Sequence, residues 1–223
     1  MQKEPYILDL DHWIIRVREP EFSGPYPVIL LLHGWTGDEN AMWVFANRLP
    51  HSSLLISPRG FYPAQPSGYG WHPVLPNEAW PRVEDFKPAI ERLLDLLTAV
   101  RFPNVDLSQI SLVGFSQGTA LSYTFALMCP ERVTAVAGLS GFLTEGAFDL
   151  VASRPLLGKR IFIAHGTRDE LVSVERARLA VELLKQAGAQ VTYCEDDVGH
   201  KLSTSCFHGL QAFFCSMSDT FSV

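Results

Sequence analysis

The sequence predicts an α/β protein built on a mostly parallel, doubly wound sheet. Two observations lead to this fold class. Segments typical of strands and of helices alternate along the chain, as in repeated βαβ units. The apolar segment 28–32 is continuous rather than alternating, which indicates a strand covered on both faces by helices.

The first half of the chain is expected to form strands, helices and one long loop. Residues 12–18 alternate in character like an early strand, and 28–32 and 54–57 are expected to be buried strands. Helices are expected over 39–48 and over 83–100, where Phe86, Ile90, Leu93 and Leu97 follow helical spacing. Segment 61–81 is rich in proline, glycine and aromatic residues and has no periodicity. Such a long loop is typical of a functional segment.

The second half continues the alternation. One strand is expected to end at residue 114, and further strands are expected over 133–139, 160–164 and 190–195. Helices are expected over 171–186 and 203–215. The residues between 139 and 160 are expected to hold a loop and one helical turn, which leaves no room for a large cap domain. We therefore expect one domain over residues 1–223, in which right-handed crossovers join the parallel strands.

Charge and composition exclude several function classes. The formal net charge is −6, and the 18 basic residues are scattered and outnumbered by 24 acidic ones, so we expect no nucleic-acid partner. The uncharged run 107–130 is long enough to span a bilayer, but its Gly, Ser, Gln and Thr content favours a buried strand and helix. Neither a signal peptide nor a membrane span is expected.

The four cysteines predict neither a disulfide framework nor a metal site. Cys129, Cys194, Cys206 and Cys215 lack C-x-x-C spacing and are too few for a disulfide scaffold. We therefore expect free thiols, a cytoplasmic location, and neither a metal ion nor an organic cofactor.

The segment Gly114-Phe115-Ser116-Gln117-Gly118 carries the strongest chemical signal in the chain. It is a G-x-S-x-G motif that follows a predicted strand and opens a predicted helix. A serine that attacks an acyl carbon must stand on such a sharp, strained turn, and the two glycines permit the close approach of neighbouring backbone. We therefore predict that Ser116 is a nucleophile.

Two further residues complete a nucleophilic triad in the expected chain order. Asp169 follows strand 160–164, and His200 follows strand 190–195, so both are expected at the edge where Ser116 lies. A neutral imidazole takes the serine proton, and a carboxylate fixes its tautomer. The order Ser116, Asp169, His200 is that of α/β-hydrolases, which is the fold we predict.

Each assignment has an alternative. Asp169 could instead cap the following helix, and Glu195, Asp196 and Asp197 lie close to His200 in sequence. His165 and His208 are the reserve candidates for the base. These alternatives are open at this point.

The backbone N–H groups of Trp35 and Gln117 are expected to bind the oxyanion. Gln117 follows the nucleophile, and Trp35 lies in the loop after strand 28–32. We expect Trp35, with Tyr69 and Trp71 from the long loop, to contact substrate and to narrow the pocket, although packing roles for these aromatic residues are an open alternative.

Five segments together resemble the phospholipase/carboxylesterase family, which includes bacterial carboxylesterases and acyl-protein thioesterases. They are Leu32-His33-Gly34-Trp35-Thr36-Gly37-Asp38, Ser57-Pro58-Arg59-Gly60, Gly114-Phe115-Ser116-Gln117-Gly118, His165-Gly166-Thr167-Arg168-Asp169 and Gly199-His200. The resemblance covers nearly the whole chain. It implies the same triad and the same oxyanion donors. The chain departs from it at Trp35 and Thr36, where the family often has a small aliphatic residue and a glycine.

These observations predict a serine carboxylesterase that acts on small, short-acyl esters through an acyl-enzyme. A thioesterase, deacylase or lysophospholipase would keep the same triad, and a non-catalytic binding module on the same fold is a further alternative. The expected partner is a small-molecule ester, and the sequence leaves a homodimer open.

Overall fold

The computed structural model describes residues 4–20, 24–74, 79–98, 102 and 104–218. Its strands pair into an eight-stranded sheet and a two-stranded sheet. The strands are β1 (Tyr6–Leu10), β2 (Trp13–Arg18), β3 (Tyr26–Leu32), β4 (Leu54–Pro58), β5 (Tyr62–Pro63), β6 (Tyr69–Gly70), β7 (Val105–Phe115), β8 (Val133–Leu139), β9 (Arg160–Gly166) and β10 (Gln190–Asp196). The helices are η1 (Ala41–Arg48), α1 (Val83–Leu96), α2 (Gln117–Met128), η3 (Pro130–Arg132), α3 (Ala147–Val151), α4 (Val174–Gln186) and α5 (Thr204–Ser218).

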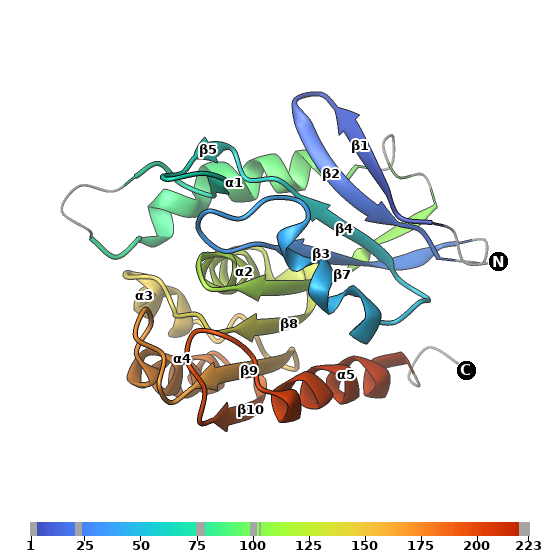
Figure 1. Ribbon diagram of the computed structural model, residues 1–223. Coiled ribbons are helices and arrows are strands. Elements are labelled where there is room, and N and C mark those ends of the chain that lie inside the picture. Colours follow the sequence, from blue (N-terminus) through green and yellow to red (C-terminus); the bar gives the residue numbers. More distant parts are fainter. Residues whose placement is uncertain (1–3, 21–23, 75–78, 99–101, 103, 219–223) are drawn as a thin grey trace.

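The large sheet is mostly parallel, as predicted. Its strand order is β1-β2-β4-β3-β7-β8-β9-β10 (Figure 1). Only the pairs β1–β2 and β2–β4 are antiparallel. No large cap is present in the described part of the chain, since the residues between β8 and β9 hold only the five-residue helix α3. The predicted α/β-hydrolase architecture is confirmed.

Strand β3 shows why continuous hydrophobicity indicated a sheet covered on both faces. Its alternate residues enter two different cores: Val28, Leu30 and Leu32 join one cluster, and Ile29 and Leu31 join the other. Side chains of α1, α2, α3 and α4 complete the first cluster, and side chains of η1 and α5 complete the second. The sheet therefore lies between two helical layers (Figure 1).

Several element boundaries differ from the expected ones. The hairpin strand β1 was not predicted, because three of its five residues are exposed and its turn uses Asp11 and His12 at positive φ. The segment predicted as a helix over 39–48 is a 3-10 helix, η1. The expected helix over 83–100 ends as α1 at Leu96, and residues 99–101 lie outside the described part.

The uncharged run 107–130 is a strand followed by a helix, as predicted. Strand β7 and helix α2 account for most of it, and every residue of α2 except Met128 is buried. A search of the described ranges found no helix long and apolar enough to cross a membrane.

Candidate active site

Ser116 occupies a strained turn between β7 and α2. Its backbone has φ 51° and ψ −114°, which is rare for any residue with a side chain. A Cβ atom added at Gly114 would collide with the backbone of Gly118, and one added at Gly118 would collide with the carbonyl of Leu32. Glycine is therefore required on both sides of the serine.

Asp169 and His200 meet beyond the ends of β9 and β10. The Nδ1–H of His200 donates to Oδ2 of Asp169 at 2.7 Å. The other carboxylate oxygen accepts the backbone N–H groups of Leu171 at 3.0 Å and Val172 at 2.9 Å. Both oxygens of this buried carboxylate are thus bound. The contact leaves Nε2 as the ring nitrogen of His200 that does not face Asp169.

The helix-cap alternative for Asp169 is only partly realised. Its carboxylate closes the turn that precedes α4, but the N-cap of α4 is Ser173. The same turn explains why this helix starts at Val174 rather than at residue 171. Capping a turn and orienting His200 use different oxygens of the one side chain, so the two roles are compatible.

The three carboxylates that precede His200 in the chain have partners other than its ring. The pairs are Glu195 with Arg178 at 2.7 Å, Asp196 with Ser205 at 2.7 Å, and Asp197 with Arg168 at 2.6 Å. Hydrogen bonds from Arg178 lower the pKa of Glu195, and those from Ser205 lower the pKa of Asp196.

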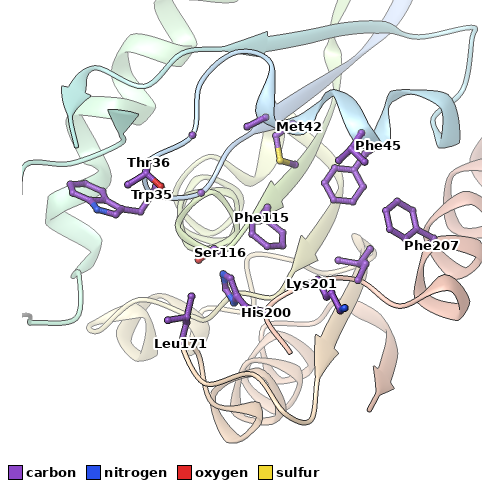
Figure 2. A pocket seen from close by; sticks show the side chains of 15 residues that line it. Trp35, Thr36, Met42, Phe45, Phe115, Ser116, Leu171, His200, Lys201 and Phe207 are labelled. Carbon is purple, nitrogen blue, oxygen red and sulfur yellow. Dashed lines mark hydrogen bonds between the residues drawn. The ribbon is translucent and has the colours of Figure 1, made fainter. Parts of the chain in front are cut away.

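Neither reserve histidine lines a cavity beside Ser116. His165 is buried, and its Nε2–H donates to the carbonyl of Val172 at 2.8 Å. Burial lowers its pKa, so the ring is neutral beside Asp169, whose Oδ2 lies 3.5 Å from Nε2. His208 is exposed on α5. His200, in contrast, lines the same cavity as Ser116 (Figure 2).

The N–H groups of Trp35 and Gln117 flank the serine without a protein acceptor in the part of the chain that is described. Gln117 is the first residue of α2, where an N–H has no partner within the helix. The loop of Trp35 runs beside the nucleophile, since a Cβ added at Gly34 would lie 3.2 Å from the Cβ of Ser116. Two unpaired N–H donors, one of them at a helix N-terminus, can stabilise a developing negative charge.

His33 fixes the loop that carries Trp35. Its Nδ1–H donates to the carbonyl of Gly34 at 2.7 Å, and its Nε2 accepts the N–H of Gly60 at 2.9 Å. Burial lowers the pKa of His33, and the neutral ring is the form that can both donate and accept. A single tautomer thus holds this loop against the segment that follows β4.

A partly buried ion pair supports the same junction. Glu39 receives two hydrogen bonds from the guanidinium of Arg59, at 2.7 Å and 2.9 Å. These bonds lower the pKa of Glu39. The guanidinium also lies 4.8 Å from the centre of the Tyr69 ring.

Tyr69 and Trp71 pack against the loop that carries Trp35, and neither is among the residues that line the two cavities beside Ser116. Their expected contact with substrate stays a prediction. Trp71 is fully buried, and its Nε1–H donates to the carbonyl of His33 at 2.8 Å. Tyr69 donates its backbone N–H to the carbonyl of Gly37 at 2.9 Å. The sequence indicated aromatic residues in this loop but not which of them point inward.

Two cavities open beside Ser116. The larger is about 660 Å³ and is lined by His200 and by apolar side chains, among them Met42, Phe45 and Phe207 (Figure 2). The smaller is about 410 Å³ and is lined by residues that include His72, Val74, Trp80 and Phe142. Trp35 lines both cavities, and its expected contact with substrate stays a prediction.

His72 is a cavity residue that the sequence argument did not select. Its Nε2 accepts a hydrogen bond from the side-chain amide of Gln117 at 2.9 Å, and its Nδ1–H donates to the carbonyl of Pro73 at 2.6 Å. Burial lowers its pKa, so the ring is neutral. Its position next to Trp71 in the long loop was the one signal available. The apolar cavity residues gave none, because they look like ordinary core residues in the sequence.

Cys194 and Cys206 form a disulfide, which contradicts the expectation of four free thiols. Their Cα atoms are 5.7 Å apart, and the bridge joins β10 to α5. The two cysteines are 12 residues apart, and the loop between them carries His200. Their proximity depends on how α5 packs beside β10, which the spacing in the sequence does not reveal. Cys129 and Cys215 are free.

No group of three or more His, Cys, Asp or Glu side chains that could hold a metal ion occurs among the residues with described positions. The arrangement at Ser116 consists of a serine on a strained turn, a histidine bound to a carboxylate, and two unpaired N–H donors. It can perform acyl transfer by nucleophilic catalysis.

Comparisons with known proteins agree with this chemistry. The model of the phospholipase/carboxylesterase family matches residues 16–217. Acyl-protein thioesterase 1 of Yarrowia lipolytica is 25% identical over 185 residues, which cover 75% of this chain and 80% of that protein. The Bacillus cereus carboxylesterase has a similar fold, with a TM-score of 0.81, 21% identity and coverage of 92% of this chain and 95% of that one. A carboxylesterase from Mesorhizobium loti has a TM-score of 0.71 at 20% identity, over 96% of this chain and 99% of that one.

Proposed function

Because the chain belongs to the phospholipase/carboxylesterase family and is therefore a hydrolase that acts on esters, we propose that it hydrolyses small carboxylic esters with short acyl groups. The proposed reaction passes through an acyl-enzyme on Ser116. The observation that carries the proposal is that His200, held by Asp169 at 2.7 Å, lines one cavity with Ser116.

In the proposed mechanism Ser116 Oγ attacks the acyl carbon while Nε2 of His200 takes the serine proton. The carbon–oxygen bond to the alcohol then breaks, and the same proton passes from Nε2 to the leaving alcohol. A water molecule repeats the sequence on the acyl-enzyme and releases the acid. Asp169 holds the Nδ1–H tautomer throughout and stabilises the charged ring.

The N–H groups of Trp35 and Gln117 are proposed to bind the oxyanion of each tetrahedral intermediate. A donor of this kind lowers the activation barrier by about 3 to 4 kcal/mol in comparable sites. The proposal is supported by the absence of a protein acceptor for either N–H in the described structure and by the position of Gln117 at the start of α2.

The proposed limit to short acyl groups rests on the aromatic side chains that wall the smaller cavity. Trp35, Trp80 and Phe142 line it. The ring centre of Trp80 lies 4.5 Å from that of Phe142 and 3.5 Å from the guanidinium carbon of Arg176. Aromatic side chains packed in this way leave little room for a longer acyl chain. A series of p-nitrophenyl esters of increasing acyl length tests the limit. We expect kcat/KM to be highest for acetyl and butyryl esters, and a rise toward long chains would contradict it.

Thioester hydrolysis is the second candidate, because the curated relative in Yarrowia lipolytica is an acyl-protein thioesterase. The same triad serves both reactions. Turnover of an ester and a thioester with the same acyl group separates them: we expect a higher kcat/KM for the ester, and the reverse would favour the thioesterase.

The proposed partner is a small-molecule ester. A homodimer is an untested proposal, which sedimentation velocity would decide. A cytoplasmic location is likewise a proposal, and the disulfide argues for testing it by cell fractionation, since disulfides persist mainly in oxidising compartments.

A further inference from the structure

The two cavities beside Ser116 are adjacent and share part of their lining. Trp35, Ser116 and Leu171 line both of them. Every other lining residue belongs to one side only. Ser116 therefore stands at the junction of two separate spaces, as an ester with bulk on both sides of its carbonyl would require.

The side on which His200 lies distinguishes the two cavities. His200 lines the larger cavity and not the smaller, whereas Gln117 lines the smaller and not the larger. In Figure 2, His200 and Ser116 lie next to each other among the residues that line the larger cavity. The ring of His200 also packs against Phe115, another wall of that cavity, with centroids 4.9 Å apart.

The proton transfer decides which part of the ester enters each side. Nε2 of His200 must come within hydrogen-bond distance of the alcohol oxygen when the ester bond breaks. The alcohol therefore leaves toward His200, and with the carbonyl oxygen held by the two N–H donors, the acyl group must extend away from His200.

We propose that the larger cavity binds the alcohol portion of the ester, and that the preferred substrates join a bulky apolar alcohol to a small acyl group. This inference rests on the proposed function. Met42, Phe45, Phe115 and Phe207 give the larger cavity its apolar walls, which suit an aromatic or branched hydrocarbon group. The acyl group enters the smaller cavity.

Two isomeric esters test the assignment in the wild-type protein. Phenethyl acetate carries its ring on the alcohol side, and methyl hydrocinnamate carries the same ring on the acyl side. Their carbonyl groups have similar intrinsic reactivity, so a difference in kcat/KM reports the cavities. We expect phenethyl acetate to be preferred by about tenfold or more.

The chain offers a matched pair of variants. Val44 lines the larger cavity and is 65% exposed, and Val74 lines the smaller cavity and is 68% exposed. Tryptophan at either position narrows one cavity from its rim with little effect on the core. We expect Val44→Trp to lower the preference for phenethyl acetate about tenfold and Val74→Trp to raise it.

Deacylation provides an independent readout, because the alcohol has already left at that stage. In burst experiments, Val44→Trp should slow acylation by phenethyl acetate and leave the breakdown rate of the acetyl-enzyme within about twofold of wild type. Val74→Trp should slow breakdown of the hydrocinnamoyl-enzyme.

The assignment would be overturned if Val44→Trp changed the tolerance for large acyl groups and the rate of deacylation instead. It would also be overturned if both variants changed the hydrolysis of both isomers equally. If the wild-type protein hydrolysed neither ester and a fluorophosphonate probe failed to label Ser116, the proposed function itself would fail, and the cavity assignment with it.

Discussion

Asp169 accepts three hydrogen bonds, and the proposed mechanism depends on the one from His200. An asparagine could still close the turn at Leu171 and Val172, but its amide group would face Nδ1 of His200 as a donor and favour the wrong tautomer. We therefore predict that Asp169→Asn lowers kcat by about three to four orders of magnitude.

Asp197→Asn is the matched control, because Asp197 is close to His200 in the chain but its carboxylate pairs with Arg168. Asp196→Asn serves the same purpose. Steady-state kinetics should show a loss of less than about tenfold for either control. If Asp197→Asn were crippling and Asp169→Asn nearly silent, the carboxylate partner of His200 would have to be reassigned.

Three buried histidines make the stability of the protein sensitive to mild acid. Burial lowers the pKa values of His33, His72 and His165 below the value of an unfolded histidine, near 6.5. Below that value the unfolded chain binds more protons than the folded one. The free energy of unfolding should therefore be constant above about pH 7 and decrease as pH falls toward 5, by up to about 1.4 kcal/mol per pH unit for each histidine.

Urea unfolding at several pH values between 5 and 8 measures this dependence, and His72→Gln serves as the control. The variant should reduce the slope, since it removes one of the three groups. A free energy of unfolding that stayed level or rose as pH fell would show that these rings are protonated in the folded protein.

The disulfide acts at the scale of elements, because it ties β10 to α5 across the loop of His200. We predict that a Cys194→Ser/Cys206→Ser variant loses about 3 kcal/mol of unfolding free energy, the entropy difference expected for a closed loop of this length. Urea unfolding with and without a phosphine reductant measures it, and the variant should not respond to the reductant.

Cys215→Ser, which removes a free and exposed thiol, should leave the unfolding curve unchanged. A thiol assay of the denatured, non-reduced wild-type protein should count two free cysteines, Cys129 and Cys215. Four reactive thiols would contradict the bridge.

The sequence predicts those elements whose signal is local. The strands at 133–139 and 190–195 carry enough hydrophobicity to be recognised, and the structure has β8 and β10 there. Strand β1 is mostly exposed, and its pairing with β2 depends on a turn at positive φ, so no local pattern marked it.

The same distinction holds in the candidate site. Ser116, Asp169 and His200 could be placed together because parallel strands bring their carboxyl ends to one edge of the sheet. The cavity walls could not be predicted, because they depend on which face of a loop packs inward. Trp71 turns into the core while its neighbour His72 lines a cavity.

At the scale of the whole molecule, the two hydrophobic clusters share the strands of one sheet. Residues of β3 and β7 contribute to both, so neither cluster can lose its packing alone. We predict a single cooperative unfolding transition, as for one domain over residues 1–223. Far-ultraviolet circular dichroism and tryptophan fluorescence should give superimposable urea curves, and two separated transitions would indicate more than one unit.

The central claim is that Ser116 is the nucleophile of an ester hydrolase. The most direct measurement compares wild type with Ser116→Ala in hydrolysis of p-nitrophenyl acetate and in labelling by a fluorophosphonate probe, with circular dichroism to confirm an unchanged fold. We predict that wild type hydrolyses the ester and is labelled at Ser116, and that the variant loses the label and at least about three orders of magnitude in kcat. A folded Ser116→Ala variant that kept about a tenth of the wild-type kcat would contradict the claim.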